Sequence, residues 1–242
     1  MQKNNSLDTL FIVMPAYNEK ENIENVFKQW YPILKDKNIN SKLVIADSGS
    51  TDGTHEILEN FQKKYPQLEI LTNTNKQHGP KIIALYSYAI KHNADYIFQT
   101  DSDGQTNPDE FEDFWKLREQ YDGIFGHRNI REDGKNRAFV EKIVCFLLKI
   151  YFGVNIPDAN APFRLMKVNT LGKYLNKMPT DYNLPNIMIT TYFAYYKENI
   201  LFKTISFKSR QKGTNSINIH KIIKIGWKAL GDFYYFKKSI NN

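Results

Sequence analysis

Four short apolar runs, each followed by a polar loop, organise the first hundred residues of the chain. The runs occupy residues 10–14, 42–46, 68–72 and 96–100. Runs of this length and composition are typical of strands that are buried on both faces. Between the runs, apolar residues recur at helical spacing over 22–34, 54–65 and 81–92. This alternation predicts an α/β fold with a mostly parallel sheet flanked by helices.

Polar clusters follow three of these strands at the point where each strand ends. They are Ala16–Glu19 after the first strand, Asp47–Asp52 after the second and Asp101–Asp103 after the fourth. Right-handed crossovers place the carboxyl ends of parallel strands at one edge of the sheet, where the ligands of such folds bind. The sequence therefore predicts one ligand crevice built by three loops that are distant in sequence.

Asp101 and Asp103 are the strongest candidates for chemistry, because these two carboxylates flank Ser102 directly after a buried strand. Both side chains can reach one hard divalent cation, Mg²⁺ or Mn²⁺, which takes few carboxylates and completes its shell with water and phosphate oxygens. Such a metal would neutralise a diphosphate and stabilise it as a leaving group. The alternative is a capped turn, since Asp and Ser also favour loops.

Three residues of the first two loops suit a nucleoside. Tyr17 can stack on a base, Glu19 can accept from ribose hydroxyls, and Asp47 can accept from a base N–H or a ribose hydroxyl. The alternative for these loops is helix initiation, with Asn18 as the cap of the first helix. We interpret Asp52 as a structural residue of the second loop.

The three motifs, in this order and spacing, resemble the family 2 glycosyltransferases of the GT-A fold. The matching segments are Val13–Glu19, Ile45–Thr54 and Thr100–Asp103. The resemblance implies a Rossmann-like GT-A sheet and an inverting transferase that uses a nucleotide-diphosphate sugar. It also implies a divalent cation, Mg²⁺ or Mn²⁺, with Asp101 and Asp103 as its ligands. The donor-binding residues that we expect are Pro15, Tyr17, Glu19, Asp47, Lys81, Asp101 and Ser102.

Segments of the second half resemble the polyprenyl-phosphate glycosyltransferases, the group that includes dolichol-phosphate mannose synthase. These segments are Gly126–Arg128, Asp158–Arg164 and Arg210–Ser216. Arg suits an acceptor phosphate because its planar guanidinium can bind two phosphate oxygens together. The implied acceptor-binding residues are Arg128, Arg137, Asp158, Arg164 and Arg210, and the implied catalytic set is Asp101, Asp103, Arg128 and Arg210. The chain departs from the family pattern at Ser48, where a second Asp is common, and at Ala161–Pro162, which replaces Ser-Gly.

The acceptor determines whether the reaction needs a general base. A hydroxyl acceptor must lose a proton as it attacks, and many relatives place a Glu-Asp pair well after the metal site for this task. Residues 180–186 contain no such pair, which leaves Asp181 and Asp158 as the candidate bases. A phosphate acceptor is already anionic and needs only positioning. We therefore expect a polyprenyl phosphate or another lipid-linked acceptor, with a sugar hydroxyl in cell-surface polysaccharide synthesis as the alternative.

The charge of the chain leaves one alternative outside enzymes. Lys and Arg outnumber Asp and Glu by 33 to 26, and the excess lies largely in the last 120 residues. A basic nucleic-acid-binding protein without catalysis is therefore an alternative, but no nucleic-acid-binding motif is present and we expect no nucleic-acid partner. A dinucleotide oxidoreductase would need Gly-x-Gly-x-x-Gly after the first strand, where the chain has Pro15–Asn18.

The pattern also predicts the domain organisation and the location of the protein. We expect a transferase domain over 1–212, with a donor half at 1–110 and an acceptor half at 111–212. A tail over 213–242 contains the pattern of a basic amphipathic helix, which is typical of a helix that binds a membrane surface or packs on protein. Residues 139–152 have a similar pattern and allow the same two interpretations. Cys145 is the only cysteine, which favours the cytoplasm or the cytoplasmic face of a membrane.

Overall fold

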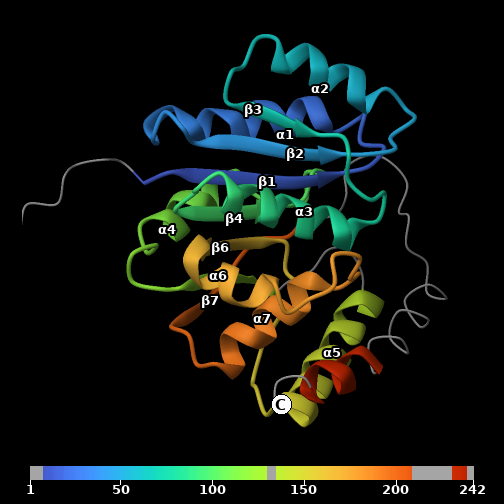
Figure 1. Cartoon of the computed structure of the whole chain (residues 1–242), viewed down its shortest axis with the longest axis vertical. Coiled ribbons are helices and arrows are strands. Elements are labelled where there is room, and N and C mark those ends of the chain that lie inside the picture. Colours follow the sequence, from blue (N-terminus) through green and yellow to red (C-terminus); the bar gives the residue numbers. More distant parts are fainter. Residues whose placement is uncertain (1–7, 130–134, 209–230, 239–242) are drawn as a thin grey trace, which may run out of the picture.

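One seven-stranded sheet forms the centre of the molecule (Figure 1). The structure is a computed structural model that describes residues 8–129, 135–208 and 231–238. The strand order across the sheet is β3-β2-β1-β4-β6-β5-β7. The strands are β1 (Leu10–Ala16), β2 (Lys42–Asp47), β3 (Leu68–Leu71), β4 (Tyr96–Thr100), β5 (Gly123–His127), β6 (Phe163–Lys167) and β7 (Ile200–Thr204).

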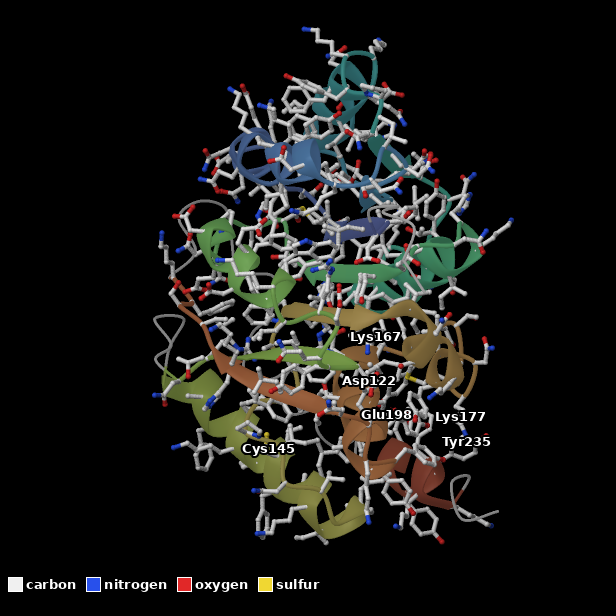
Figure 2. All side chains as sticks on the ribbon, turned by 90° about the vertical axis from the view of Figure 1, so that its left-hand side faces the viewer. Asp122, Cys145, Lys167, Lys177, Glu198 and Tyr235 are labelled. Carbon is white, nitrogen blue, oxygen red and sulfur yellow. The ribbon has the colours of Figure 1, made fainter. Side chains whose placement is uncertain are left out.

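The sheet is mixed but mostly parallel, as the sequence predicts. Only β6 runs against its neighbours β4 and β5, and the other strand pairs are parallel. The four strands predicted from apolar runs are present within two residues of the expected ends. At the amino end of β5, Asp122 forms an ion pair with Lys167 of β6 at 3.2 Å (Figure 2). The last three strands were not predicted individually.

Helices and short 3₁₀ turns connect the strands. The helices are α1 (Ile23–Trp30), α2 (Thr54–Gln62), α3 (His78–Lys91), α4 (Phe111–Trp115), α5 (Lys135–Phe152), α6 (Val168–Leu175) and α7 (Pro185–Tyr195), and the 3₁₀ turns are η1 (Tyr31–Asp36) and η2 (Pro108–Glu110). The helix expected over 22–34 ends earlier, at Trp30, because Pro32 lacks the N–H that would continue the α-helix and lies in the first turn of η1. The helix expected from Lys81 begins earlier, because its first turn accommodates Pro80.

The two faces of the sheet carry separate apolar cores. Leu10, Ile12 and Met14 point to the face covered by α1, α2 and α4. Phe11 and Val13 point to the opposite face, which packs against α3, α5, α6 and α7. This alternation follows from the two-residue period of a strand and explains why the β1 sequence is apolar throughout. The sheet is therefore a rigid support for the loops at its carboxyl edge.

The predicted C-terminal tail lies mostly outside the described residues. Residues 231–238 form a helix, and Figure 1 shows it beside α5. The Phe233 ring lies 6.2 Å from Phe152 and 6.3 Å from Tyr151, and the Phe236 ring lies 5.0 Å from Tyr182. This part of the tail thus packs on the domain. No helix in the described parts of the chain is long and apolar enough to cross a membrane.

Gly79, in the first turn of α3, allows a close approach of two backbones. A Cβ atom at this position would lie 2.5 Å from the backbone of Asn183. We expect Gly79→Ala to lower the free energy of unfolding by about 1–3 kcal/mol, the usual range for overpacking. Urea denaturation measures this change.

Gly172 in α6 provides a matched control for this substitution. A Cβ atom there would meet only Ile90, at 4.0 Å, which is ordinary contact. Because alanine favours helices over glycine, Gly172→Ala should leave stability unchanged or raise it by about 0.5–1 kcal/mol. Equal destabilisation by the two substitutions would contradict the close approach at Gly79.

Candidate active site

The three polar loops predicted from the sequence do meet at the carboxyl edge of the sheet. β1 lies between β2 and β4, so the segments that follow these strands are neighbours. The Ser102 hydroxyl donates a hydrogen bond of 2.8 Å to the carbonyl of Pro15. This bond joins the loop after β4 to the end of β1 and holds Asp101 and Asp103 beside the first loop.

The loops after β1 and β2 are joined by side chains that bind the backbone of the opposite loop. The Asn18 amide N–H donates to the Ser50 hydroxyl at 3.0 Å, and the Glu19 N–H donates to the Thr54 hydroxyl at 2.9 Å. The Asn18 side chain accepts from the Thr51 N–H at 2.8 Å. Asn18 therefore connects the two loops, and the alternative that it caps the first helix is wrong.

Asp52 has the structural role expected from the sequence. Its carboxylate accepts from the Lys20 N–H at 3.0 Å and from the Thr54 N–H at 3.0 Å. Burial raises the pKa of Asp52, but the hydrogen bonds from Thr54 and Lys20 outweigh it and leave the pKa below its usual value. Asp52 thus holds the second loop in place.

Tyr17, Asp47 and Lys81 come together from three separate elements. The Lys81 Nζ donates to the Ala16 carbonyl at 2.5 Å and lies 5.2 Å from the centre of the Tyr17 ring. Burial lowers the pKa of Lys81 to about 8, and the charge of Asp47 opposes this shift. Tyr17 remains 47% exposed, so its aromatic side chain is accessible to a ligand.

Asp47 lies almost fully buried at the end of β2. One carboxylate oxygen accepts from the Ser50 hydroxyl at 2.5 Å, and the other lies 3.2 Å from the His55 Nδ1. Glu19 is also buried and accepts from the Asn22 side-chain amide at 2.8 Å. Both carboxylates are therefore fixed by neighbouring side chains before any ligand binds.

Asp101 and Asp103 form a pair in which one carboxylate oxygen has no partner. The Oδ1 atom of Asp101 is buried without a hydrogen-bond donor among the described residues, whereas Asp103 accepts from the Gln105 N–H at 3.1 Å. Burial, and then the charge of Asp103, raise the pKa of Asp101 to about 8. An unpaired buried carboxylate is costly, and a cation would compensate for it.

The set of ligands fits a metal that is shared with a substrate. Across the described residues, no group of three or more His, Cys, Asp or Glu is arranged to hold a metal ion. Two carboxylates alone suit Mg²⁺ or Mn²⁺, whose remaining positions are taken by water and phosphate oxygens. Asp101 and Asp103 therefore have the chemistry to bind a metal–diphosphate complex.

Arg128 forms a buried bidentate ion pair with Asp158. The Arg128 Nε and Nη2 donate to the two oxygens of Asp158 at 2.7 and 2.8 Å, and the Arg128 backbone N–H adds a bond of 3.2 Å. The guanidinium lies 5.1 Å from the centre of the Phe207 ring. The structure thus brings together two of the predicted acceptor-binding residues, as partners of each other.

Arg164 is a different case, because its side chain is only 1% exposed. Its guanidinium donates to the carbonyls of Ala161, at 2.8 Å, and of Asn186, at 3.1 Å. It also donates to the Thr190 hydroxyl at 3.3 Å. This packing does not fit the acceptor contact expected from the sequence. Arg164 instead fixes the loop before β6 to α7.

Two further arginines and a candidate base were predicted from the sequence. Arg137 lies in α5, but its side chain is outside the described set, and Arg210 lies outside the described residues altogether. Of the two candidate bases, Asp158 is taken by Arg128, and Asp181 is exposed in a turn before α7. The expectations for Arg137, Arg210 and Asp181 remain predictions.

Glu141 is a residue of this region that the sequence did not single out. Its carboxylate accepts from the Ala159 N–H at 2.8 Å and lies 3.7 Å from the Arg128 Nη2. It therefore ties α5 to the loop that carries Asp158. The available signal was that Glu141 is the only acidic residue in an otherwise apolar and basic helix.

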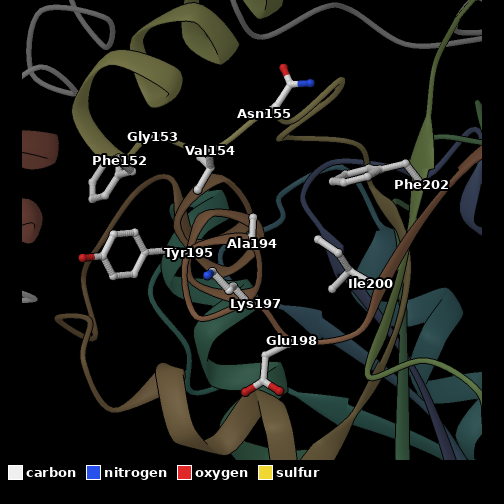
Figure 3. A pocket seen from close by; sticks show the side chains of 10 residues that line it. All are labelled: Phe152, Gly153, Val154, Asn155, Ala194, Tyr195, Lys197, Glu198, Ile200 and Phe202. Carbon is white, nitrogen blue, oxygen red and sulfur yellow. The ribbon is translucent and has the colours of Figure 1, made fainter.

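The structure also contains a cavity of about 540 Å³ away from this edge of the sheet (Figure 3). It is lined by side chains from the ends of α5 and α7 and from β7, including Phe152, Tyr195 and Phe202. Because β7 is parallel to β5, its first residue, Ile200, lies at the amino edge of the sheet. The cavity is therefore separate from the three loops.

Comparison with known proteins places the chain in a family. The profile of Glycosyl transferase family 2 matches residues 11–175, which include Tyr17, Asp47, Asp101 and Asp103. The chain is a family 2 glycosyltransferase. The resemblance drawn from the three motifs is confirmed, and the enzyme interpretation replaces the nucleic-acid-binding alternative.

Relatives of this transferase include two named for lipid-linked substrates. Undecaprenyl-phosphate 4-deoxy-4-formamido-L-arabinose transferases of Shewanella sediminis and Pseudomonas savastanoi pv. phaseolicola are 26% and 27% identical, over 68% and 63% of this chain. The chain spans about half the length of these relatives, 50% and 45%. An uncharacterized protein of Methanocaldococcus jannaschii is 28% identical over 89% of this chain and 90% of its own length.

Solved structures confirm the fold of the transferase. Glucosyl-3-phosphoglycerate synthase of Mycobacterium tuberculosis has a TM-score of 0.68 at 15% identity, covering 96% of this chain and 80% of that one. TarS of S. aureus has a TM-score of 0.56 at 18% identity, covering 83% of this chain and 60% of that one. At these identities the likeness shows a common GT-A fold.

Proposed function

We propose that this glycosyltransferase moves a sugar from a nucleotide-diphosphate sugar to a polyprenyl phosphate, with the help of a divalent metal at Asp101 and Asp103. The observation that carries the proposal is the unpartnered Oδ1 of Asp101 beside Asp103, at the edge where Tyr17, Asp47 and Lys81 gather. A cation between these carboxylates and a diphosphate would satisfy both partners.

The donor half of the proposal is supported by the solved relative. Glucosyl-3-phosphoglycerate synthase of M. tuberculosis was solved with uridine diphosphate, and also with Mn²⁺ and uridine-diphosphate-glucose. In this chain the exposed side chain of Tyr17 would stack on the base, and Asp47 would accept from the base or the ribose. When bound, the metal would neutralise the diphosphate and make it a better leaving group.

The proposed reaction inverts the anomeric carbon. An acceptor phosphate oxygen forms a bond to that carbon on one face while the bond to the diphosphate oxygen breaks on the other. The electron pair of the broken bond stays on the departing nucleoside diphosphate. No proton has to leave the acceptor, so the reaction does not require the Glu-Asp pair that residues 180–186 lack.

The acceptor half of the proposal rests on the site and on two relatives. Asp158, one candidate base for a hydroxyl acceptor, is held by Arg128 in a bidentate ion pair. A carboxylate bound in this way is a weak proton acceptor. The names of the two arabinose transferases refer to undecaprenyl phosphate, which is an acceptor of the expected class.

A transfer assay with paired acceptors tests this function. The full chain is supplied with uridine- and guanosine-diphosphate sugars, Mn²⁺, and either detergent-solubilised undecaprenyl phosphate or a set of free glycans. We expect sugar transfer to undecaprenyl phosphate and at least about a hundredfold less to glycan hydroxyls, because Asp158, the candidate base beside Arg128, is held in an ion pair. Efficient transfer to a glycan hydroxyl, with none to the lipid phosphate, would overturn the proposed acceptor.

A further inference from the structure

α5, the longest helix in the described part of the chain, lies at the rim of the molecule (Figure 1) and has an unusual outer surface. Four large apolar residues on it are exposed, and their exposed fractions are 65% for Phe139, 43% for Ile143, 61% for Phe146 and 61% for Ile150. They follow one another in steps of four, three and four residues, which keeps them on one side of a helix. We call these four residues the α5 stripe.

The opposite side of α5 packs on the domain. Leu148 is fully buried, and Phe152 is 4% exposed against the apolar core. Glu141, on the same inner side, accepts from Ala159 and lies 3.7 Å from Arg128. α5 is therefore anchored to the domain by its inner face, and its packing does not require the α5 stripe.

The charges on α5 are distributed asymmetrically. The helix sequence carries four basic residues and one acidic residue, and that acid, Glu141, is turned inward toward Arg128. Lys142 and Lys149 are exposed and lie about two helical turns apart along the flank of the stripe. The outer surface of α5 thus combines large apolar side chains with cations and carries no carboxylate.

We propose that the α5 stripe docks the enzyme on an anionic lipid bilayer. An apolar helix face flanked by lysines enters the boundary between headgroups and acyl chains, while the lysines attract anionic headgroups. A second copy of the chain fits less well, because pairing two α5 helices would bring Lys142 and Lys149 of both copies close together. At about 1.5 Å per residue the stripe is about 16 Å long, so it would lie along the surface.

This docking connects the bilayer with the proposed active site, and in that respect the inference rests on the proposed function. A helix with its side chains is about 10–12 Å across. The stripe lies on one side of α5 and Glu141, which contacts Arg128, on the other. A lipid phosphate at the bilayer surface would therefore need to move only about one helix diameter to reach Arg128.

Vesicle binding by the full chain tests the surface without any transfer reaction. The protein is sedimented with vesicles of phosphatidylcholine alone or of phosphatidylcholine with phosphatidylglycerol. We expect binding to the anionic vesicles, and a loss of about tenfold or more in Phe146→Glu/Ile150→Glu, which equals about 1.4 kcal/mol. Lys142→Gln/Lys149→Gln should remove the preference for phosphatidylglycerol and the dependence on salt.

Ile39→Glu is the matched control, because Ile39 is 82% exposed and lies before β2, far along the sheet from α5. It should bind vesicles like the wild type. The docking is overturned if the wild type binds neither kind of vesicle or if Phe146→Glu/Ile150→Glu binds equally well. It is also overturned if the double substitution instead dissolves a dimer, or lowers the unfolding temperature without changing vesicle binding.

The two proposals fail in distinguishable ways. Uridine-diphosphate binding in solution should be the same in the wild type and in Phe146→Glu/Ile150→Glu, because the stripe is not part of the donor site. If the wild type binds vesicles but transfers no sugar to undecaprenyl phosphate, the proposed acceptor is wrong, whereas the docking of the α5 stripe on a bilayer is supported. If the wild type transfers sugar in detergent but binds no vesicles, the docking of the α5 stripe is wrong, whereas the proposed acceptor is supported.

Discussion

Asp103→Asn is expected to lower kcat for sugar transfer by about a hundred- to a thousandfold, the scale on which a lost charge contact to a transition state acts. Asparagine keeps an oxygen that can accept from the Gln105 N–H, so the loop should keep its shape. What it loses is the second negative charge beside Asp101. Steady-state kinetics with Mn²⁺ and saturating donor measure this change.

Asp109→Asn is the matched control for this substitution. Asp109 is exposed in η2, six residues further along the same loop region, and undergoes the same chemical change. It should retain the kcat of the wild type. If Asp103→Asn retains full activity, or if the two variants lose activity equally, the assignment of Asp103 as a metal ligand fails.

The pH dependence of metal binding follows from the same pair of carboxylates. Without a metal, burial and then the charge of Asp103 raise the pKa of Asp101 to about 8. At neutral pH a proton therefore competes with the cation for Asp101. The apparent affinity for Mn²⁺ should rise as the pH increases toward about 8 and level off above it.

Asp158→Ala is expected to lower the free energy of unfolding by about 3–5 kcal/mol, because it leaves the buried guanidinium of Arg128 without its bidentate partner. Glu141, at 3.7 Å from Arg128, compensates only in part, so the loss should fall toward the lower end of this range. Urea denaturation of the full chain measures it. In contrast, Glu24→Gln breaks an exposed ion pair with Lys28 and should leave the midpoint unchanged.

A double substitution separates the effects on stability and on activity. Arg128→Met/Asp158→Ala removes both partners of the buried ion pair, and Glu141 keeps the hydrogen bond from the Ala159 N–H, so much of the lost stability should return. Sugar transfer should stay low, because the acceptor phosphate has lost the charge of Arg128. If Asp158→Ala alone is as stable as the wild type, the ion pair does not support the loop as described.

The half of the fold that binds the donor was predictable because its signals are local. β1, β2 and β4 are apolar along their length, since both faces of the sheet are covered, and each ends at a polar cluster. The rule that parallel strands share a carboxyl edge then placed Asp47, Asp101 and Asp103 close together. No long-range contact had to be known for this step.

The other half depends on contacts that no local pattern shows. β6 contains Arg164, a charged residue that is buried only because carbonyls of Ala161 and Asn186 accept from it. The sequence motif suggested a phosphate contact for Arg164. Its burial could not be predicted from that motif, because its partners on α7 are distant in the chain. The pairing of Arg128 with Asp158, and the support from Glu141, likewise become visible only once β5, α5 and β6 are packed.

Titration calorimetry of a nucleoside diphosphate, with Mn²⁺ or with a chelator present, tests the central claim most directly. The account predicts that uridine or guanosine diphosphate binds the wild type and Asp109→Asn at least about tenfold more tightly with Mn²⁺, whereas Asp103→Asn shows no such gain. Equal affinity of the wild type with Mn²⁺ and with the chelator would contradict a metal bridge between Asp101, Asp103 and the diphosphate.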